Sequence, residues 1–171
     1  MLSKKILVVY FSRAEDNYNV GTIEIGNTEL LAKEIIAKTD ADEFKIEPKD
    51  KYPTDYQETI ERATEERKNN ARPEYIGDID ISSYDTIFIG YPIWWEDMPM
   101  IVYNFIEKHN WNGKIVIPFN THEGSGNAGT YEILKSKMPN ATLKGDGFNM
   151  AGFVARTENG IKKLDDWLNS L

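Results

Sequence analysis

The chain of 171 residues is 40% apolar, which favours one domain over residues 1–171 with a well-buried core. It has no cysteine and only two histidines, which excludes disulfides and thiolate ligands and disfavours a zinc site. The net charge of −8 opposes binding of nucleic acid, and no basic stripe with interleaved aromatic residues offsets it. No apolar run is long enough for a membrane span and no signal peptide is recognisable, so we expect a cytoplasmic protein.

Apolar patterns predict alternating strands and helices along the whole chain. Short continuous apolar runs predict strands over residues 4–11, 44–47, 85–90, 114–120 and, more weakly, 142–148. Helical spacing predicts helices over residues 27–39, 53–71, 99–109 and 128–138. A closing helix places five apolar residues on one face: Ile161, Leu164, Trp167, Leu168 and Leu171. This alternation predicts a three-layer α/β/α fold with a parallel sheet, in which ligands bind beyond the carboxyl ends of the strands.

The first of three loops at those carboxyl ends covers residues 12–28. Ser12 and Arg13 follow the first strand, and Gly26, Asn27 and Thr28 lead into a helix. Hydroxyl groups and free N–H groups at a helix N-terminus can bind a phosphate dianion without a lysine. Asn27 or Thr28 alone would indicate a simple helix cap, but their position after the first strand favours the phosphate site. Arg13 either adds charge to this site or is a solvated surface residue.

The second loop, residues 91–97, begins with Tyr91, Pro92, Ile93, Trp94 and Trp95. Adjacent tryptophans where a buried strand reaches solvent indicate a flat aromatic ligand, which an indole ring can contact by offset stacking. We also expect one of the two tryptophans to be used in packing against neighbouring residues.

The third loop combines polar side chains with glycines that let a ligand approach the backbone closely: Thr121, His122, Glu123, Gly124, Ser125 and Gly126. Residues 124–129 also match the G-x-G-x-x-G dinucleotide motif, but they follow a late strand, so we interpret them as a turn that leads into a helix. His122 and Glu123 form either a proton-donating pair near a redox centre or a loop pair without a catalytic role.

Taken in this order, the three loops resemble those of the flavodoxin family over nearly the whole chain. The resemblance implies a five-stranded parallel sheet in the order 2-1-3-4-5 that binds flavin mononucleotide (FMN). The residues implied to hold the phosphate are Ser12, Asn27 and Thr28, with Arg13 and Gly26 in the same loop. The residues implied to line one side of the flavin ring are Pro92, Ile93, Trp94 and Trp95. Those implied to close its other side are Thr121, Gly124, Ser125 and Gly126, with His122 beside them.

Two departures from the family pattern stand out. An insertion over residues 14–25 splits the phosphate loop, and its Asn17, Tyr18 and Asn19 either fold over the ligand or only cover the surface. Glu96 occupies a position where similar proteins often have glycine. Because glutamate tolerates positive φ poorly and adds negative charge, we expect Glu96 to disfavour the peptide flip by which flavodoxins stabilise a semiquinone.

Several functions remain open on the sequence. An FMN-dependent electron carrier with a redox partner protein and an NAD(P)H-dependent quinone or FMN reductase with a small substrate fit equally well. A phosphoacceptor receiver domain shares the strand order but needs acidic residues after the first strand and an aspartate at the end of the third, and both are absent. A scaffold of the same fold that has lost its cofactor and binds a partner is the alternative without redox activity.

Overall fold

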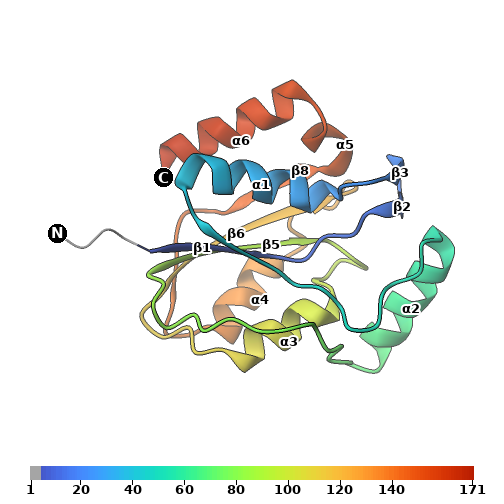
Figure 1. Ribbon diagram of the computed structural model, residues 1–171, viewed down its shortest axis with the longest axis horizontal. Helices are drawn as coiled ribbons and strands as arrows, with labels where there is room; N and C mark the ends of the chain where they lie inside the picture. Colours follow the sequence, from blue (N-terminus) through green and yellow to red (C-terminus); the bar gives the residue numbers. More distant parts are fainter. Residues whose placement is uncertain (1–4) are drawn as a thin grey trace.

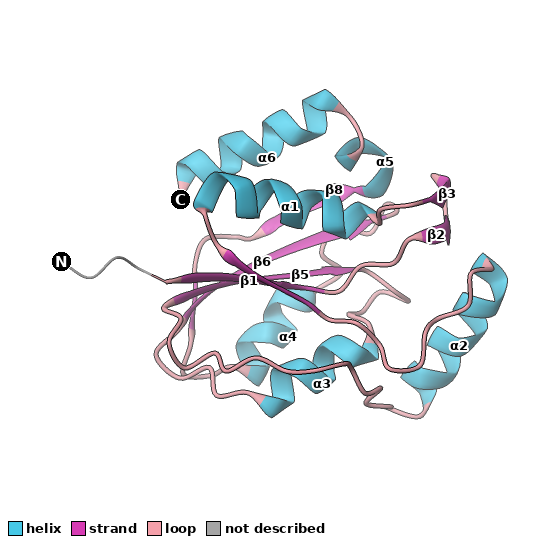
Figure 2. Cartoon of the chain, in the orientation of Figure 1, coloured by secondary structure: helices cyan, strands magenta, loops and turns pink. Residues whose placement is uncertain are grey.

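The structure is a computed structural model that describes residues 5–171; Lys4, where the first strand was expected to begin, lies outside this range. One parallel sheet forms the middle layer, and helices cover both of its faces (Figures 1 and 2). The strands of this sheet are β1 (Ile6–Tyr10), β4 (Asp42–Lys45), β5 (Thr86–Pro92), β6 (Ile115–His122), β7 (Thr142–Leu143) and β8 (Phe148–Ala151). The expected three-layer α/β/α class is confirmed.

The order of the strands is β4-β1-β5-β6, with β7 and β8 both paired to β6. Leu7 in β1 lies between Asp42 of β4 and Ile87 of β5, and all of these pairs are parallel. Counted along the chain as five strand positions, this is the expected order 2-1-3-4-5. β1, β5 and β6 therefore lie next to one another, and the loops that follow them emerge at one edge of the sheet.

The fifth strand position differs from the single strand expected over residues 142–148. Thr142 pairs with Ile115 near the start of β6, whereas Phe148 pairs with Phe119 further along. Between them the chain turns out of the sheet, with positive φ at Gly145 and Gly147. A side chain at Gly147 would overlap the ring of Tyr131, so the turn requires glycine there. The expectation of one continuous strand was wrong because these glycines interrupt it.

The helices of the structure are α1 (Asn27–Thr39), α2 (Tyr56–Lys68), α3 (Met100–Lys108), α4 (Thr130–Lys137), α5 (Gly152–Ala155) and α6 (Glu158–Ser170). The two sides of each strand alternate between two apolar cores. Leu7 and Val9 of β1 face the core beneath α3 and α4, and Val8 and Tyr10 face the core beneath α1 and α6. Figure 1 shows α2 beyond the sheet, beside α3.

Capping residues determine where two of the helices begin. Asp55 caps α2 through its Oδ1, which accepts the N–H of Glu58 at 2.9 Å, so the helix begins at residue 56 and not at 53. Gly129, with φ of 76°, precedes α4 and delays its start from the expected residue 128 to Thr130. The glycine motif over residues 124–129 is therefore a turn that leads into a helix, as expected.

Candidate functional site

The first loop brings Ser12 against the start of α1. Its Oγ accepts the N–H of Glu29 at 3.0 Å, so a residue of the first loop supplies the cap that the N-terminal residue of the helix lacks. A side chain at Gly26 would come closer than 3.0 Å to both Ser12 Oγ and the carbonyl oxygen of Arg13, so glycine is required for this approach. The N–H groups of Asn27 and Thr28 begin the helix and have no preceding turn to accept them. They form a site with positive partial charge.

A buried pair of hydroxyl groups joins the first loop to the third. Thr28 Oγ1 lies 2.7 Å from Thr121 Oγ1, and the two residues are 1% and 3% exposed. The backbone N–H of Ile93 donates to the carbonyl of Thr121 at 2.9 Å, which joins the second loop to the third. The three loops identified in the sequence therefore meet at one place on the sheet edge.

Arg156 adds a positive charge to this place that sequence analysis did not find. Its Nη1 donates to Asn27 Oδ1 at 3.1 Å and to the carbonyl of Ile25 at 2.9 Å. A side chain at Gly152 would overlap the side chains of Asn27 and Glu123, so the start of α5 also packs closely against the first and third loops.

In the second loop, the two tryptophans differ in environment. Trp94 makes edge-to-face contacts with Phe11 and Tyr52, with ring centroids 5.3 and 5.1 Å apart. Trp95 is 50% exposed. The expectation that one tryptophan is used in packing is confirmed, and Trp95 remains available at the surface.

A tight turn follows at Trp95 and Glu96, which have φ of 53° and 57°. Backbone bonds in both directions between Trp94 and Asp97, at 2.8 and 3.1 Å, close this turn. Two successive left-handed residues are typical of a type I′ turn, which favours Gly or Asn. The structure thus gives Glu96 the positive φ that we expected it to tolerate poorly.

The third loop begins at the end of β6. The N–H of Gly124 donates to His122 Nδ1 at 3.0 Å, which assigns the ring proton to Nε2 when the imidazole is neutral. Gly124 and Gly126 have positive φ, and the side chain of Ser125 is exposed. The buried Asn120 donates to the carbonyl of Gly126 at 3.0 Å and fixes the far end of the loop.

Burial shifts the pKa values of the two titratable groups of this loop, His122 and Glu123, in opposite directions. It lowers the pKa of His122, although a hydrogen bond with Asn149 opposes the shift. It raises the pKa of Glu123, although a hydrogen bond from Asn19 opposes that shift. In both residues burial disfavours the charged form.

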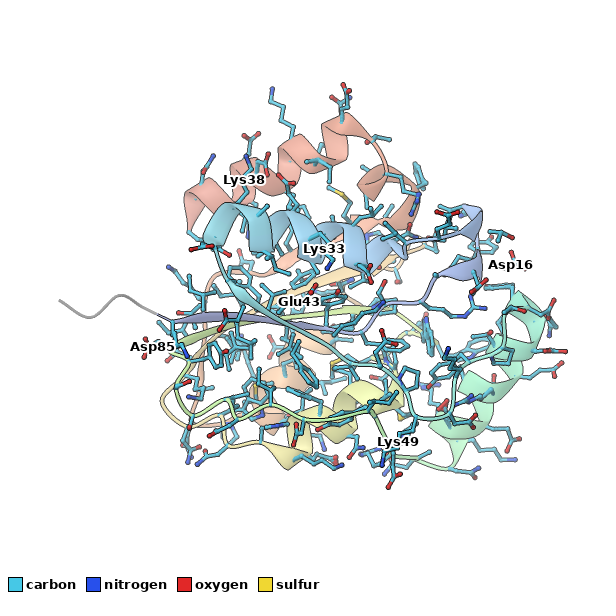
Figure 3. All side chains as sticks on the ribbon, in the orientation of Figure 1. Asp16, Lys33, Lys38, Glu43, Lys49 and Asp85 are labelled. Atoms are coloured by element: carbon cyan, nitrogen blue, oxygen red, sulfur yellow. The ribbon has the colours of Figure 1, made fainter. Side chains whose placement is uncertain are left out.

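The insertion forms a hairpin of β2 (Glu15–Asn17) and β3 (Gly21–Ile23), which we call the insertion hairpin. On one side Asn19 Nδ2 donates to Glu123 Oε2 at 3.0 Å. On the other side Tyr18 stacks on Tyr56 of α2, and Asp16 Oδ2 accepts the N–H of Tyr56 at 3.3 Å. Figure 3 labels Asp16 on the insertion hairpin, next to α2. The insertion hairpin therefore spans the site from the third loop to α2.

Arg13 holds the base of the insertion hairpin against the segment before α2. Its guanidinium donates to the carbonyl oxygens of Asp16, Pro53 (2.7 Å) and Thr54 (3.0 Å), while its Nε is buried without a partner. A hollow of about 170 Å³, which we call the aromatic hollow, lies between this arginine, α2 and the tryptophan loop. Its aromatic lining residues are Tyr56, Trp94 and Trp95.

The described part of the chain holds no cluster of three or more His, Asp or Glu side chains that could bind a metal ion. Within residues 5–171, none of the helices is both long and apolar enough to span a membrane.

A parallel α/β sheet with a helix N-terminus, a tryptophan loop and a glycine-rich loop at one edge defines a flavodoxin-like protein. The flavodoxin family model matches residues 5–171, and the chain belongs to this family. No functionally curated protein matches the sequence.

Solved structures show the same fold. A protein from Bacteroides eggerthii, provisionally described as a flavoprotein, is 31% identical, with a TM-score of 0.76 and coverage of 98% of each chain. A second such protein, from Bacteroides uniformis, is 26% identical, with a TM-score of 0.75 and coverage of 98% of this chain and 99% of that one. A flavoprotein from Lactobacillus acidophilus, solved in complex with FMN, is 19% identical, with a TM-score of 0.68 and coverage of 96% and 99%.

Proposed function

We propose that this chain binds FMN across its three loops and transfers electrons through it. The observation that carries the proposal is the convergence of the loops, which the Thr28–Thr121 and Ile93–Thr121 hydrogen bonds hold together. Membership of the flavodoxin family and the FMN complex of the Lactobacillus acidophilus relative support the choice of ligand.

The first loop suits a phosphate dianion. Gly26 lets Ser12 pack against the start of α1, and the N–H groups of Asn27 and Thr28 provide donors with the positive end of the helix dipole behind them. Arg156 adds a full positive charge next to Asn27. The Thr28 hydroxyl is committed to Thr121, so its contribution here is to hold the first and third loops together, while its N–H serves the anion.

The second and third loops suit a planar ring. Pro92, Ile93 and the two tryptophans would line one side, with Trp94 held by its contacts to Phe11 and Tyr52. The third loop would close the other side, where Gly124, Ser125 and Gly126 expose backbone groups to the polar edge of the ring. His122 lies at the base of this loop, and burial favours its neutral form.

Bound FMN would supply the redox chemistry, since it accepts and donates one or two electrons. The protein's own groups would bind and orient it. The acidic net charge of −8 would disfavour an additional negative charge on the reduced ring and so lower its potential. An electron carrier and a two-electron reductase both fit this arrangement.

Titration of apoprotein with FMN, followed by quenching of flavin fluorescence, tests the proposal. We expect one FMN per chain and a loss of affinity of at least about tenfold in Gly26→Ala, because the added methyl group displaces Ser12 from the start of α1. Gly77→Ala is the matched control, because its added Cβ meets nothing within 4 Å. The positive φ at this position makes alanine lower the stability of the fold, but FMN affinity should not change. Absence of FMN binding by the folded wild-type protein would favour the cofactor-free scaffold instead.

A further inference from the structure

A basic groove lies on the α3 and α4 side of the molecule, beside the C-terminal end of α2. It has a volume of about 670 Å³, within the range of small-ligand sites. Four cationic side chains line it, Arg67, Lys68, Arg72 and Lys137, against one acidic side chain, Asp97. This local excess of positive charge is opposite in sign to the net charge of −8 of the chain.

Two of the four cations have an acidic partner. Arg72 Nε lies 2.8 Å from Glu107 Oε2, and Arg67 Nε lies 3.9 Å from Asp97 Oδ2. Among the residues that the structure describes, Lys68 and Lys137 have no carboxylate within 4.0 Å. Both lysines lie in the last turn of a helix, where a cation offsets the helix dipole. That role explains each lysine singly but not their convergence on one groove.

Aromatic rings complete the groove. Arg72 and Lys137 lie over the ring of Tyr103, 5.1 and 5.6 Å from its centroid. The half-exposed Trp95 lines both the basic groove and the aromatic hollow, so the two spaces adjoin at this indole. A ligand that extends from the groove to Trp95 therefore needs several negative charges at one end and a planar ring at the other.

We propose that the basic groove binds the phosphates of a nicotinamide dinucleotide, with the nicotinamide end toward Trp95. The requirement for a polyanion comes from the groove itself, and the choice of a nicotinamide rests on the proposed function, because this compound would supply electrons to FMN. Lys68 and Lys137 match the two charges of a pyrophosphate, and Arg67, whose nearest carboxylate is 3.9 Å away, can contact a further phosphate, so the groove favours NADP over NAD.

An acidic redox protein is the other occupant that this charge would attract. The adjoining aromatic hollow, lined by Tyr56, Trp94 and Trp95, favours a small molecule with a planar ring, which an acidic protein surface does not supply. Binding measurements with a small molecule and with a polyanionic chain distinguish these two occupants.

The test uses the full chain loaded with FMN, with NADP⁺, NAD⁺ and poly-L-glutamate as probes, and measures binding by calorimetry at low and physiological salt. We expect NADP⁺ to bind more tightly than NAD⁺ and to lose about tenfold in affinity in Lys68→Gln/Lys137→Gln. The matched control, Lys162→Gln/Lys163→Gln, removes the same charge from two exposed lysines of α6 on the other face of the sheet. All four lysines are exposed, so folding should be retained.

Equal NADP⁺ affinity in the two double variants would overturn the inference. So would binding of poly-L-glutamate without binding of NADP⁺, which would identify a docking surface for an acidic protein. FMN titration of the same samples separates the two proposals: FMN binding without NADP⁺ binding contradicts only the groove, and NADP⁺ binding to protein that takes up no FMN contradicts only the proposed function.

Discussion

The Thr28–Thr121 hydroxyl pair gives the sharpest test of how the loops are joined. Thr28→Val keeps the shape of the side chain and removes its hydroxyl, which leaves the hydroxyl of Thr121 buried without this partner. An unpaired buried hydroxyl costs about 1–3 kcal/mol, so the free energy of unfolding should fall by that amount. Thr121→Val should cost a similar amount for the same reason. Replacing both hydroxyls removes the unpaired group, and the double variant should recover most of the loss.

Urea unfolding of the apoprotein measures these differences, provided that the m-value stays constant. Thr22→Val, at an exposed position of β3, is the control and should change stability by less than about 0.5 kcal/mol. FMN affinity, measured separately, should fall in both single variants because the phosphate loop and the ring loop are no longer held together. Strictly additive losses in the double variant would refute a direct contact between the two hydroxyls.

Three further predictions concern the second and third loops. Trp94→Ala should lower the free energy of unfolding by about 2–4 kcal/mol because it removes the contacts with the core, whereas Trp95→Ala should lower it by under about 1 kcal/mol. Equal losses in urea unfolding would contradict the different packing of the two indoles. Glu96→Gly should stabilise the apoprotein by about 1 kcal/mol because glycine adopts the left-handed conformation at this position without strain. Glu61→Gly inside α2 should destabilise it by about 1 kcal/mol. A change in Tm of the same sign in both variants would argue against strain at Glu96. Because the pKa of His122 is lowered in the folded protein, the unfolded chain binds the proton first, so the free energy of unfolding should decrease as pH falls below the usual 6.5. In His122→Gln the free energy of unfolding should depend less steeply on pH. An unchanged pH dependence would show that burial of the imidazole is not responsible.

Most of the fold could be predicted because local patterns specify it. The continuous apolar runs of β1, β5 and β6 are buried on both faces, and a short run of this kind is typical of a central parallel strand. Alternation with helices then fixes the layers, and the loops at the carboxyl ends follow from the topology. The elements that were misjudged depend on one or two residues, such as Gly145 and Gly147, which break the fifth strand position.

The candidate site was only partly predictable. The three loops were found because each carries a local signal, a helix N-terminus, paired tryptophans or clustered glycines. Arg156 was missed because it is 129 residues from Asn27 in sequence, and an arginine after a short helix carries no signal of its own. The insertion hairpin was missed as an element because its strands have three residues each and no apolar alternation. The cations of the basic groove come from residues 67–72 and Lys137, which are distant in sequence and are brought together only by the tertiary fold.

A crystal structure of the protein with FMN bound would test the central claim most directly. We expect the phosphate at the N–H groups of Asn27 and Thr28, and the flavin ring between the tryptophan loop and residues 121–126. Density for FMN at any other place, or for a ring lodged in the aromatic hollow with no phosphate at the start of α1, would contradict it.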